Sequence, residues 1–230
     1  MRKFALLFYL VFGTSAFAND ALKTAKSLTE LVPAGYVVVN QMQGDLNKDN
    51  QDDFVLLIKG TDKSYIIQDE YRGALDRNRR GIIIARKNND QYELMLKNLH
   101  CFSSENEDGG VYFPPEMNIS INKGNLYFHY MHGRYGHWTY TFRSQNSDFE
   151  LIGFDSSVNR GPIVERAVSV NFMTRKMLVK ENMNRDEEAE EDVFKETWKK
   201  FSLAKRIKLS EVDDFDNLKI DKLINISDSR

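Results

Sequence analysis

The stretch MNISINKGNLYFHYMHGRYGHWTYTFRSQNSDFELIGFD, residues 117–155, decides the fold class. Its apolar and aromatic runs lie at 117–121, 125–132, 137–143 and 149–155, and turn residues separate them at 122–124, 133–136 and 146–148. Short runs of β-branched and aromatic residues between such turns predict strands. Turns this short join antiparallel neighbours, so the stretch predicts a meander.

The same pattern extends outward in both directions. Single strands are expected at 36–39 and 54–58, and hairpins at 81–85 with 92–96 and at 167–172 with 176–181. Asn88-Asn89-Asp90 supplies the turn of the first hairpin. We therefore expect a mostly β chain, with a minor α component, built from antiparallel meander or sandwich-like sheets.

A short helix is expected near each end of the mature chain. Asp20 can cap a helix over 21–31. Near the other end, residues 185–192 carry six acids in eight positions, which suits a helix N-terminus. Phe194, Trp198 and Phe201 then recur at helical spacing, so this second helix should pack an aromatic stripe on the sheet.

The predicted organisation has two β-rich halves of similar length. They cover 19–102 and 111–208, joined by a polar, mobile loop at 103–110 and followed by an acidic tail at 209–230. A cluster in that tail, Asp213, Asp214 and Asp216, is interpreted as solvated acids rather than a second cation site. Because the halves share no residue-level repeat, a propeller is not expected.

Residues 1–18 have the pattern of a signal peptide. Arg2 and Lys3 precede an apolar run over 4–12, and Ala16-Phe17-Ala18 forms a small-x-small cleavage site. Cleavage near Ala18 would export the protein, to the periplasm or outside the cell; the alternative is an uncleaved N-terminal anchor. No later run reaches the about 20 apolar residues of a membrane span, so none is expected in the mature protein.

Composition narrows the classes of partner. Loss of residues 1–18 removes two basic residues and no acid, and takes the formal net charge from −2 to −4. An acidic chain without a basic patch is not expected to bind nucleic acid. Cys101 is the only cysteine, so no intrachain disulfide can form, and we expect it to be a small buried apolar residue.

The most specific motif is the loop Asp45-Leu46-Asn47-Lys48-Asp49-Asn50-Gln51-Asp52-Asp53. Oxygen-bearing side chains stand at alternate positions, as calcium prefers because it takes about 6–8 oxygen ligands. The expected ligands are the side chains of Asp45, Asn47, Asp49 and Asp53 with the carbonyl of Gln51. Asn50 occupies the sharp turn, where a left-handed backbone is needed. The competing interpretation is a solvated acidic turn held by Asx hydrogen bonds, without metal.

Residues 44–55 resemble the calcium-binding half of an FG-GAP/VCBS repeat, in which such a loop joins two antiparallel strands. The resemblance implies the ligand set given above and a structural calcium ion. The chain departs from the family by having Asn50 in place of Gly and by carrying the loop once. An EF-hand fits less well because Leu56 stands where that motif has Glu. The resemblance and the compact signal peptide favour a bacterial source.

Three of the four histidines lie in 129–138, around the turn at 133–136. If that turn pairs His132 with His137, the two imidazoles share one face, with Met131 and Trp138 facing the core. Structural packing is one interpretation of this stretch. The other is a ligand surface formed by His132, Arg134, Tyr135 and His137, because exposed aromatics beside Arg suit sugars or peptides.

No local hydrolase or phosphate-binding motif occurs, so catalytic residues are not assigned. We expect a binding or structural module of unknown ligand, such as a glycan or an envelope protein, rather than an enzyme. The alternatives are an exported hydrolase of polysaccharide or peptide with structural calcium, and an adhesion or envelope-assembly module.

Overall fold

The computed structural model describes residues 24–108, 114–184 and 193–227. The signal-peptide prediction at 1–18 and the acidic run at 185–192 lie outside the described residues. In the part described, no helix is long and apolar enough to cross a membrane.

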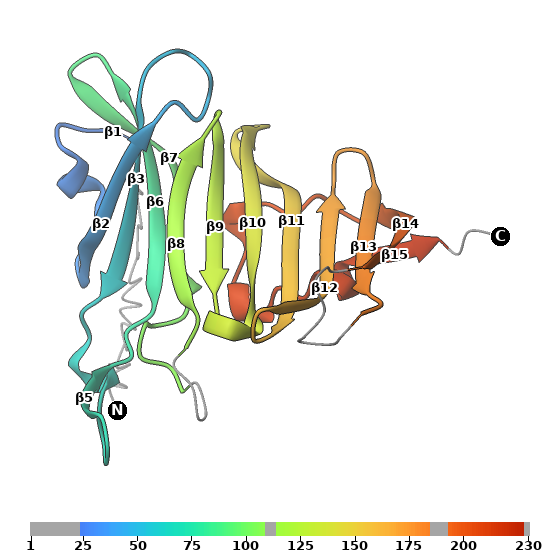
Figure 1. Cartoon of the computed structure of the whole chain (residues 1–230). Coiled ribbons are helices and arrows are strands. Elements are labelled where there is room, and N and C mark those ends of the chain that lie inside the picture. Colours follow the sequence, from blue (N-terminus) through green and yellow to red (C-terminus); the bar gives the residue numbers. More distant parts are fainter. Residues whose placement is uncertain (1–23, 109–113, 185–192, 228–230) are drawn as a thin grey trace, which may run out of the picture.

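Two antiparallel sheets make up most of the fold (Figure 1). In spatial order, the first contains β1 (Thr24–Ala25), β7 (Gln91–Phe102), β6 (Arg80–Asn88), β3 (Asp53–Gly60) and β2 (Tyr36–Gly44). The second contains β15 (Ile224–Ser227), β14 (Phe194–Leu203), β13 (Lys176–Asn182), β12 (Ile163–Asn171), β11 (Asp148–Arg160), β10 (Gly136–Gln145), β9 (Asn125–Met131) and β8 (Glu116–Asn122). A small hairpin pairs β4 (Ile66–Asp69) with β5 (Gly73–Asp76). The mostly β, antiparallel prediction is confirmed.

Helical structure is confined to single turns in the described residues. Five are 3-10 turns, η1 (Leu28–Leu31), η2 (Lys63–Tyr65), η3 (Gly133–Tyr135), η4 (Leu209–Glu211) and η5 (Phe215–Asn217), and one is α-helical, α1 (Ile220–Leu223). The N-terminal helix is therefore shorter than predicted. Of the described residues 24–31, only 28–31 are helical, because Thr24 and Ala25 pair with β7 instead.

The central strands of the first sheet are buried on both faces, which explains their continuous apolar runs. Val55 and Ile84 face the main core, whereas Leu56 and Ile83 contact a second cluster that includes Ala25 and Leu31 of the N-terminal segment. Cys101, on β7, is fully buried in the main core, as predicted.

The predicted helix carrying Phe194, Trp198 and Phe201 is wrong. These residues lie on strand β14, which pairs with β13 from Lys176↔Lys200 to Asn182↔Phe194. Phe201 is buried, but Trp198 lies on the opposite face of the strand and is 61% exposed. Pairing with β12 satisfies only one edge of β13. The other edge offers backbone hydrogen bonds to residues 194–203, which favour a strand there over the helix that the spacing indicated.

The predicted acidic tail is also corrected. From Leu209 to Ile224 the chain crosses the inner face of the second sheet, behind β9 to β12 in Figure 1. Phe215, 3% exposed, stacks on Phe102 with ring centroids 5.1 Å apart and contacts Phe128 and Phe142. One buried apolar cluster thus contains residues from both predicted halves and from the segment called a tail.

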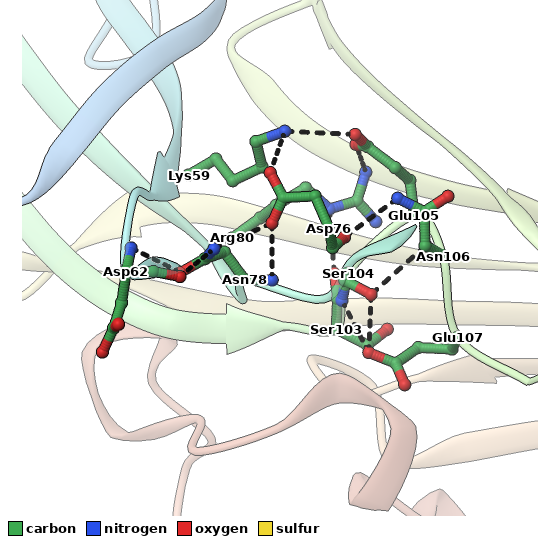
Figure 2. A network of polar contacts seen from close by, with 10 residues as sticks. All are labelled: Lys59, Asp62, Asp76, Asn78, Arg80, Ser103, Ser104, Glu105, Asn106 and Glu107. Atoms are coloured by element: carbon green, nitrogen blue, oxygen red, sulfur yellow. Dashed lines mark hydrogen bonds and ion pairs between the residues drawn. The ribbon is translucent and has the colours of Figure 1, made fainter. Parts of the chain in front are cut away.

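The loop predicted to be mobile is anchored over 103–108. Glu105 forms ion pairs with Lys59 and with Arg80, at 3.4 and 3.6 Å, and the carboxylate lies between the two cations in Figure 2. Asn106 donates to the carbonyl of Asp76, and buried Ser104 donates to Glu107 at 2.7 Å. This polar network fixes the connection to β3, β5 and β6.

Candidate functional site

The loop between β2 and β3 is held by its own acidic side chains. Oδ1 of Asp45 accepts the backbone N–H groups of Lys48 and Asp49 at 2.6 and 3.2 Å, and Oδ2 accepts that of Asn50 at 3.0 Å. Asp49 accepts the N–H of Gln51 at 2.8 Å. These Asx contacts wrap the backbone around the first carboxylate.

Two residues of the loop have left-handed backbone. Asn50 has φ of 64°, as its position in the motif predicted. Lys48, which the motif did not single out, has φ of 66°. Both conformations are uncommon for residues with a Cβ atom, so the hydrogen bonds to Asp45 must offset their cost.

The end of the loop is buried. Leu46 and Asp53 are each 1% exposed, and the N–H of Leu46 donates to Oδ2 of Asp53 at 2.9 Å. Burial raises the pKa of Asp53. The N–H of Leu46 opposes this rise, while the neighbouring carboxylates of Asp49 and Asp45 raise the pKa further. A buried carboxylate beside two others is stabilised by a nearby cation.

The predicted ligand residues share one loop, and their donor chemistry fits calcium. Carboxylate and amide oxygens are the ligands that a hard cation prefers. In the geometry of the described residues, no group of three or more His, Cys, Asp or Glu residues is arranged to hold a metal ion. The oxygens of Asp45 and Asp49 accept backbone N–H groups there, as in the metal-free interpretation of this loop.

The loop also lies where the two sheets meet. A Cβ atom at Gly44 would come within 2.9 Å of Cγ2 of Ile121 on β8. At the β8–β9 turn, a Cβ at Gly124 would come within 2.8 Å of Cε of Lys48. Both glycines therefore allow a close approach between the loop and the second sheet, and Leu46 enters the shared core.

A cavity of about 710 Å³ opens at the β9–β10 turn, on the outer face of the second sheet. All four residues of the predicted ligand surface line it, namely His132, Arg134, Tyr135 and His137. The guanidinium of Arg134 lies 5.8 Å from the ring centroid of Tyr135, a cation–π contact. This volume is within the range of small-molecule sites.

The turn does not pair His132 with His137, which was the condition for the two imidazoles to share one face. His137 lies opposite Met131, which is 46% exposed on the outer face rather than in the core. His132 instead precedes the turn η3, which takes it out of the ladder. His129 is the imidazole closest to His137, with ring centroids 5.5 Å apart.

Hydroxyl groups on neighbouring strands orient these two imidazoles. Nδ1 of His129 lies 2.7 Å from Oγ1 of Thr139, and Nδ1 of His137 lies 3.0 Å from Oγ of Ser157. Burial lowers the pKa of His129, and the neighbouring His137 lowers it further. The lowered pKa favours the neutral ring of His129, which both donates and accepts hydrogen bonds.

Two polar atoms of this cavity have no partner in the described part of the chain. Nε2 of His132 and Oδ1 of Asn159 are buried and without a hydrogen bond, and both residues line the cavity. An unsatisfied buried polar atom costs about 1–3 kcal/mol, which a ligand could recover. The sequence did not reveal Asn159, because it lies on β11, far along the chain.

His129 and Glu116 also line the cavity and were not predicted as site residues. The strand register is what identifies both residues as part of the cavity. Glu116 lies opposite Met131, and His129 lies two residues before Met131 on the same face of β9.

Comparison with known proteins adds no identification. No protein-family model matches the chain, and no curated protein or solved structure matches it either.

Proposed function

We propose that this is an exported binding protein that holds a hydroxyl-rich ligand, such as a glycan, in the outer cavity at the β9–β10 turn. The observation that carries the proposal is the pair of unpartnered buried atoms, Nε2 of His132 and Oδ1 of Asn159, among the lining residues. Tyr135 and Arg134 supply a flat apolar and cationic surface beside them.

The chemistry of the lining favours sugars. Asn159 Oδ1 can only accept, whereas a neutral imidazole nitrogen accepts or donates according to its tautomer. A ligand hydroxyl does both, so sugar hydroxyls have the chemistry to pair with either atom. An aromatic ring beside them suits the apolar face of a sugar.

Calcium has a structural role in this proposal. The residues that would hold it are Asp45, Asn47, Asp49 and Asp53, with Gln51 through its carbonyl. Bound there, the ion would supply positive charge to the buried carboxylate of Asp53 and fix the loop that carries Leu46 into the core. Export rests on residues 1–18, and sequencing the N-terminus of the mature protein tests it: Asn19 is expected first.

Titration calorimetry with soluble oligosaccharides of glucan, chitin and peptidoglycan tests the binding function. A Tyr135→Ala variant should bind the recognised sugar about tenfold more weakly, because an aromatic contact contributes about 0.5–1.5 kcal/mol. Tyr71→Ala is the matched control, since Tyr71 is 90% exposed and does not line the cavity. Absence of binding to every sugar, or equal losses in both variants, would contradict the proposal.

A hydrolase is the second candidate, favoured by the hydrogen bond between His137 and Ser157. A serine hydroxyl against an imidazole is the start of a nucleophilic site. Among the described residues, however, no carboxylate is hydrogen-bonded to that imidazole to orient it. Turnover of a bound oligosaccharide or peptide, lost in Ser157→Ala but kept in Ser156→Ala, would establish this second function.

A further inference from the structure

A second cavity, of about 540 Å³, lies on the inner face of the same sheet. Its floor is formed by side chains of β10 to β13, such as Trp138, Tyr140, Phe154 and Met177, and its roof by Ile220 and Ile224 of the C-terminal segment. Strand alternation places Tyr140, Phe154 and Met177 in one row across the sheet, on the face opposite His137.

A hydrogen bond joins the roof of the cavity to its floor. Oη of Tyr140 donates to the carbonyl of Leu218 at 3.3 Å, so this hydroxyl is satisfied by the C-terminal segment and not by a ligand. The side chains around it in the floor are apolar. An apolar molecule is therefore favoured in the cavity, since its entry removes apolar surface from water.

The cavity spans several strands of the sheet. Its lining includes Trp138 on β10 at one end and Lys199 on β14 at the other, four strands away. At about 4.8 Å per strand, this separation is about 19 Å. An apolar space that spans this many strands can hold an extended chain.

The charges of the lining are arranged unevenly. The roof holds both acids, Asp216 and Asp221, together with Lys219, whereas the ionised groups of the floor are the cations Arg166 and Lys199. Over residues 24–108, 114–184 and 193–227, neither of these cations forms an ion pair with another side chain. Lys199 thus offers a free positive charge at one end of an apolar space.

We propose that the inner cavity binds a single-chain amphiphile with an anionic headgroup. The headgroup lies at Lys199 and the acyl chain extends along the floor toward Trp138. The two cavities adjoin at η3, where His132, Tyr135 and His137 line both. This inference goes beyond the proposed function, because it concerns a ligand of different chemistry, held by the inner-face side chains of β10 to β14.

Tryptophan fluorescence tests the proposal on the full mature chain. The protein has two tryptophans, so a Trp198→Phe background leaves Trp138 as the sole reporter. Titration with decanoate should change its emission saturably. The neutral 1-decanol should bind more weakly, and acetate should have no effect, because it has a headgroup without a chain.

Two neighbouring lysines give a matched pair of variants. Lys199→Glu should weaken decanoate binding about fivefold, the scale of a solvent-screened ion pair. Lys200→Glu should leave it unchanged, since Lys200 faces the other side of β14. Val168→Phe, which fills the floor, should abolish binding, with a melting curve to verify folding.

Several results would overturn the proposal. They are no saturable change with decanoate, equal affinity for decanoate and 1-decanol, or equal losses in the Lys199 and Lys200 variants. Oligosaccharide binding by the same Trp198→Phe protein separates the two sites. If sugar binds but decanoate does not, this inference fails and the proposed function stands.

Discussion

The backbone N–H of Leu46 donates to the carboxylate of Asp53 across 2.9 Å, and both residues are 1% exposed. This contact closes the β2–β3 loop and joins the second position of the motif to its last. It places an acid at the boundary of the hydrophobic core, where a nearby cation would stabilise the charged carboxylate.

Calcium should therefore stabilise the protein. At a calcium concentration of about 100 times Kd, the free energy of unfolding should rise by about 2.7 kcal/mol, a shift of several degrees in Tm. Asp49→Ala should abolish the shift, whereas Asp52→Ala, which changes an exposed acid outside the ligand set, should retain it. Identical melting curves in calcium and in chelator would rule out the site.

Without calcium, Asp53 should make stability fall as pH rises. Its pKa is raised in the folded state, so the folded protein binds the proton more tightly than the unfolded chain. The destabilisation develops between the unfolded pKa of about 3.9 and the higher folded value. In urea titrations over this range, the stability of the wild type relative to Asp53→Asn should fall as pH rises.

The opposite pH dependence is expected of Glu150, which is 3% exposed. Burial alone would raise its pKa, but hydrogen bonds from Asn146, Arg206 and Gln145 hold the pKa below its usual range. Its stabilisation is present above the unfolded pKa of about 4.3 and is lost as pH falls through the folded value.

Glu150→Ala should lower the free energy of unfolding at neutral pH by about 2–3 kcal/mol, because it leaves the two amide donors without their acceptor. Glu181→Ala, which removes a more exposed acid, is the control. A loss of the same size in the control, measured by urea denaturation, would contradict the account of the buried carboxylate.

Substitutions at Asn50 test the left-handed backbone conformation of the loop. Asn50→Ala should destabilise the protein by about 1–2 kcal/mol, because its φ of 64° is unfavourable for alanine. Asn50→Gly should be within about 0.5 kcal/mol of wild type, since glycine adopts this conformation freely. Equal stability of the two variants would mean that the left-handed turn does not form.

The C-terminal segment should be indispensable for folding. Phe215→Ala removes a ring buried among four other aromatic rings and should cost about 3–5 kcal/mol. Val193→Ala, at a residue 56% exposed, should change stability by less than about 0.5 kcal/mol. A Phe215→Ala protein as stable as wild type would contradict the observed core.

The meander was predictable because its signals are local. Turn residues such as Asn122 and Gly124 stand between short apolar runs, and hairpin pairing follows from them. Strand β14 was not predictable in this way. Its partner β13 lies beyond the acidic run, and the spacing of Phe194 and Trp198 fits one face of a helix or of a strand equally well.

The candidate site was predictable in part for the same reason. The residues around Arg134 and Tyr135 are contiguous, so composition identified them. The proximity of His129 to His137 depends on where the ladder ends and η3 begins, and Asn159 arrives from another strand. Contacts that depend on strand register in this way can be identified only when the fold is known.

Full burial of Cys101 has a consequence for the handling of this protein. Burial raises the pKa of the thiol, and the thiolate is the reactive form. A thiol reagent can reach the sulfur only when the core between β7 and the C-terminal segment opens. The rate at which the lone cysteine is labelled therefore measures the local opening of the core, and no cysteine has to be introduced for the measurement.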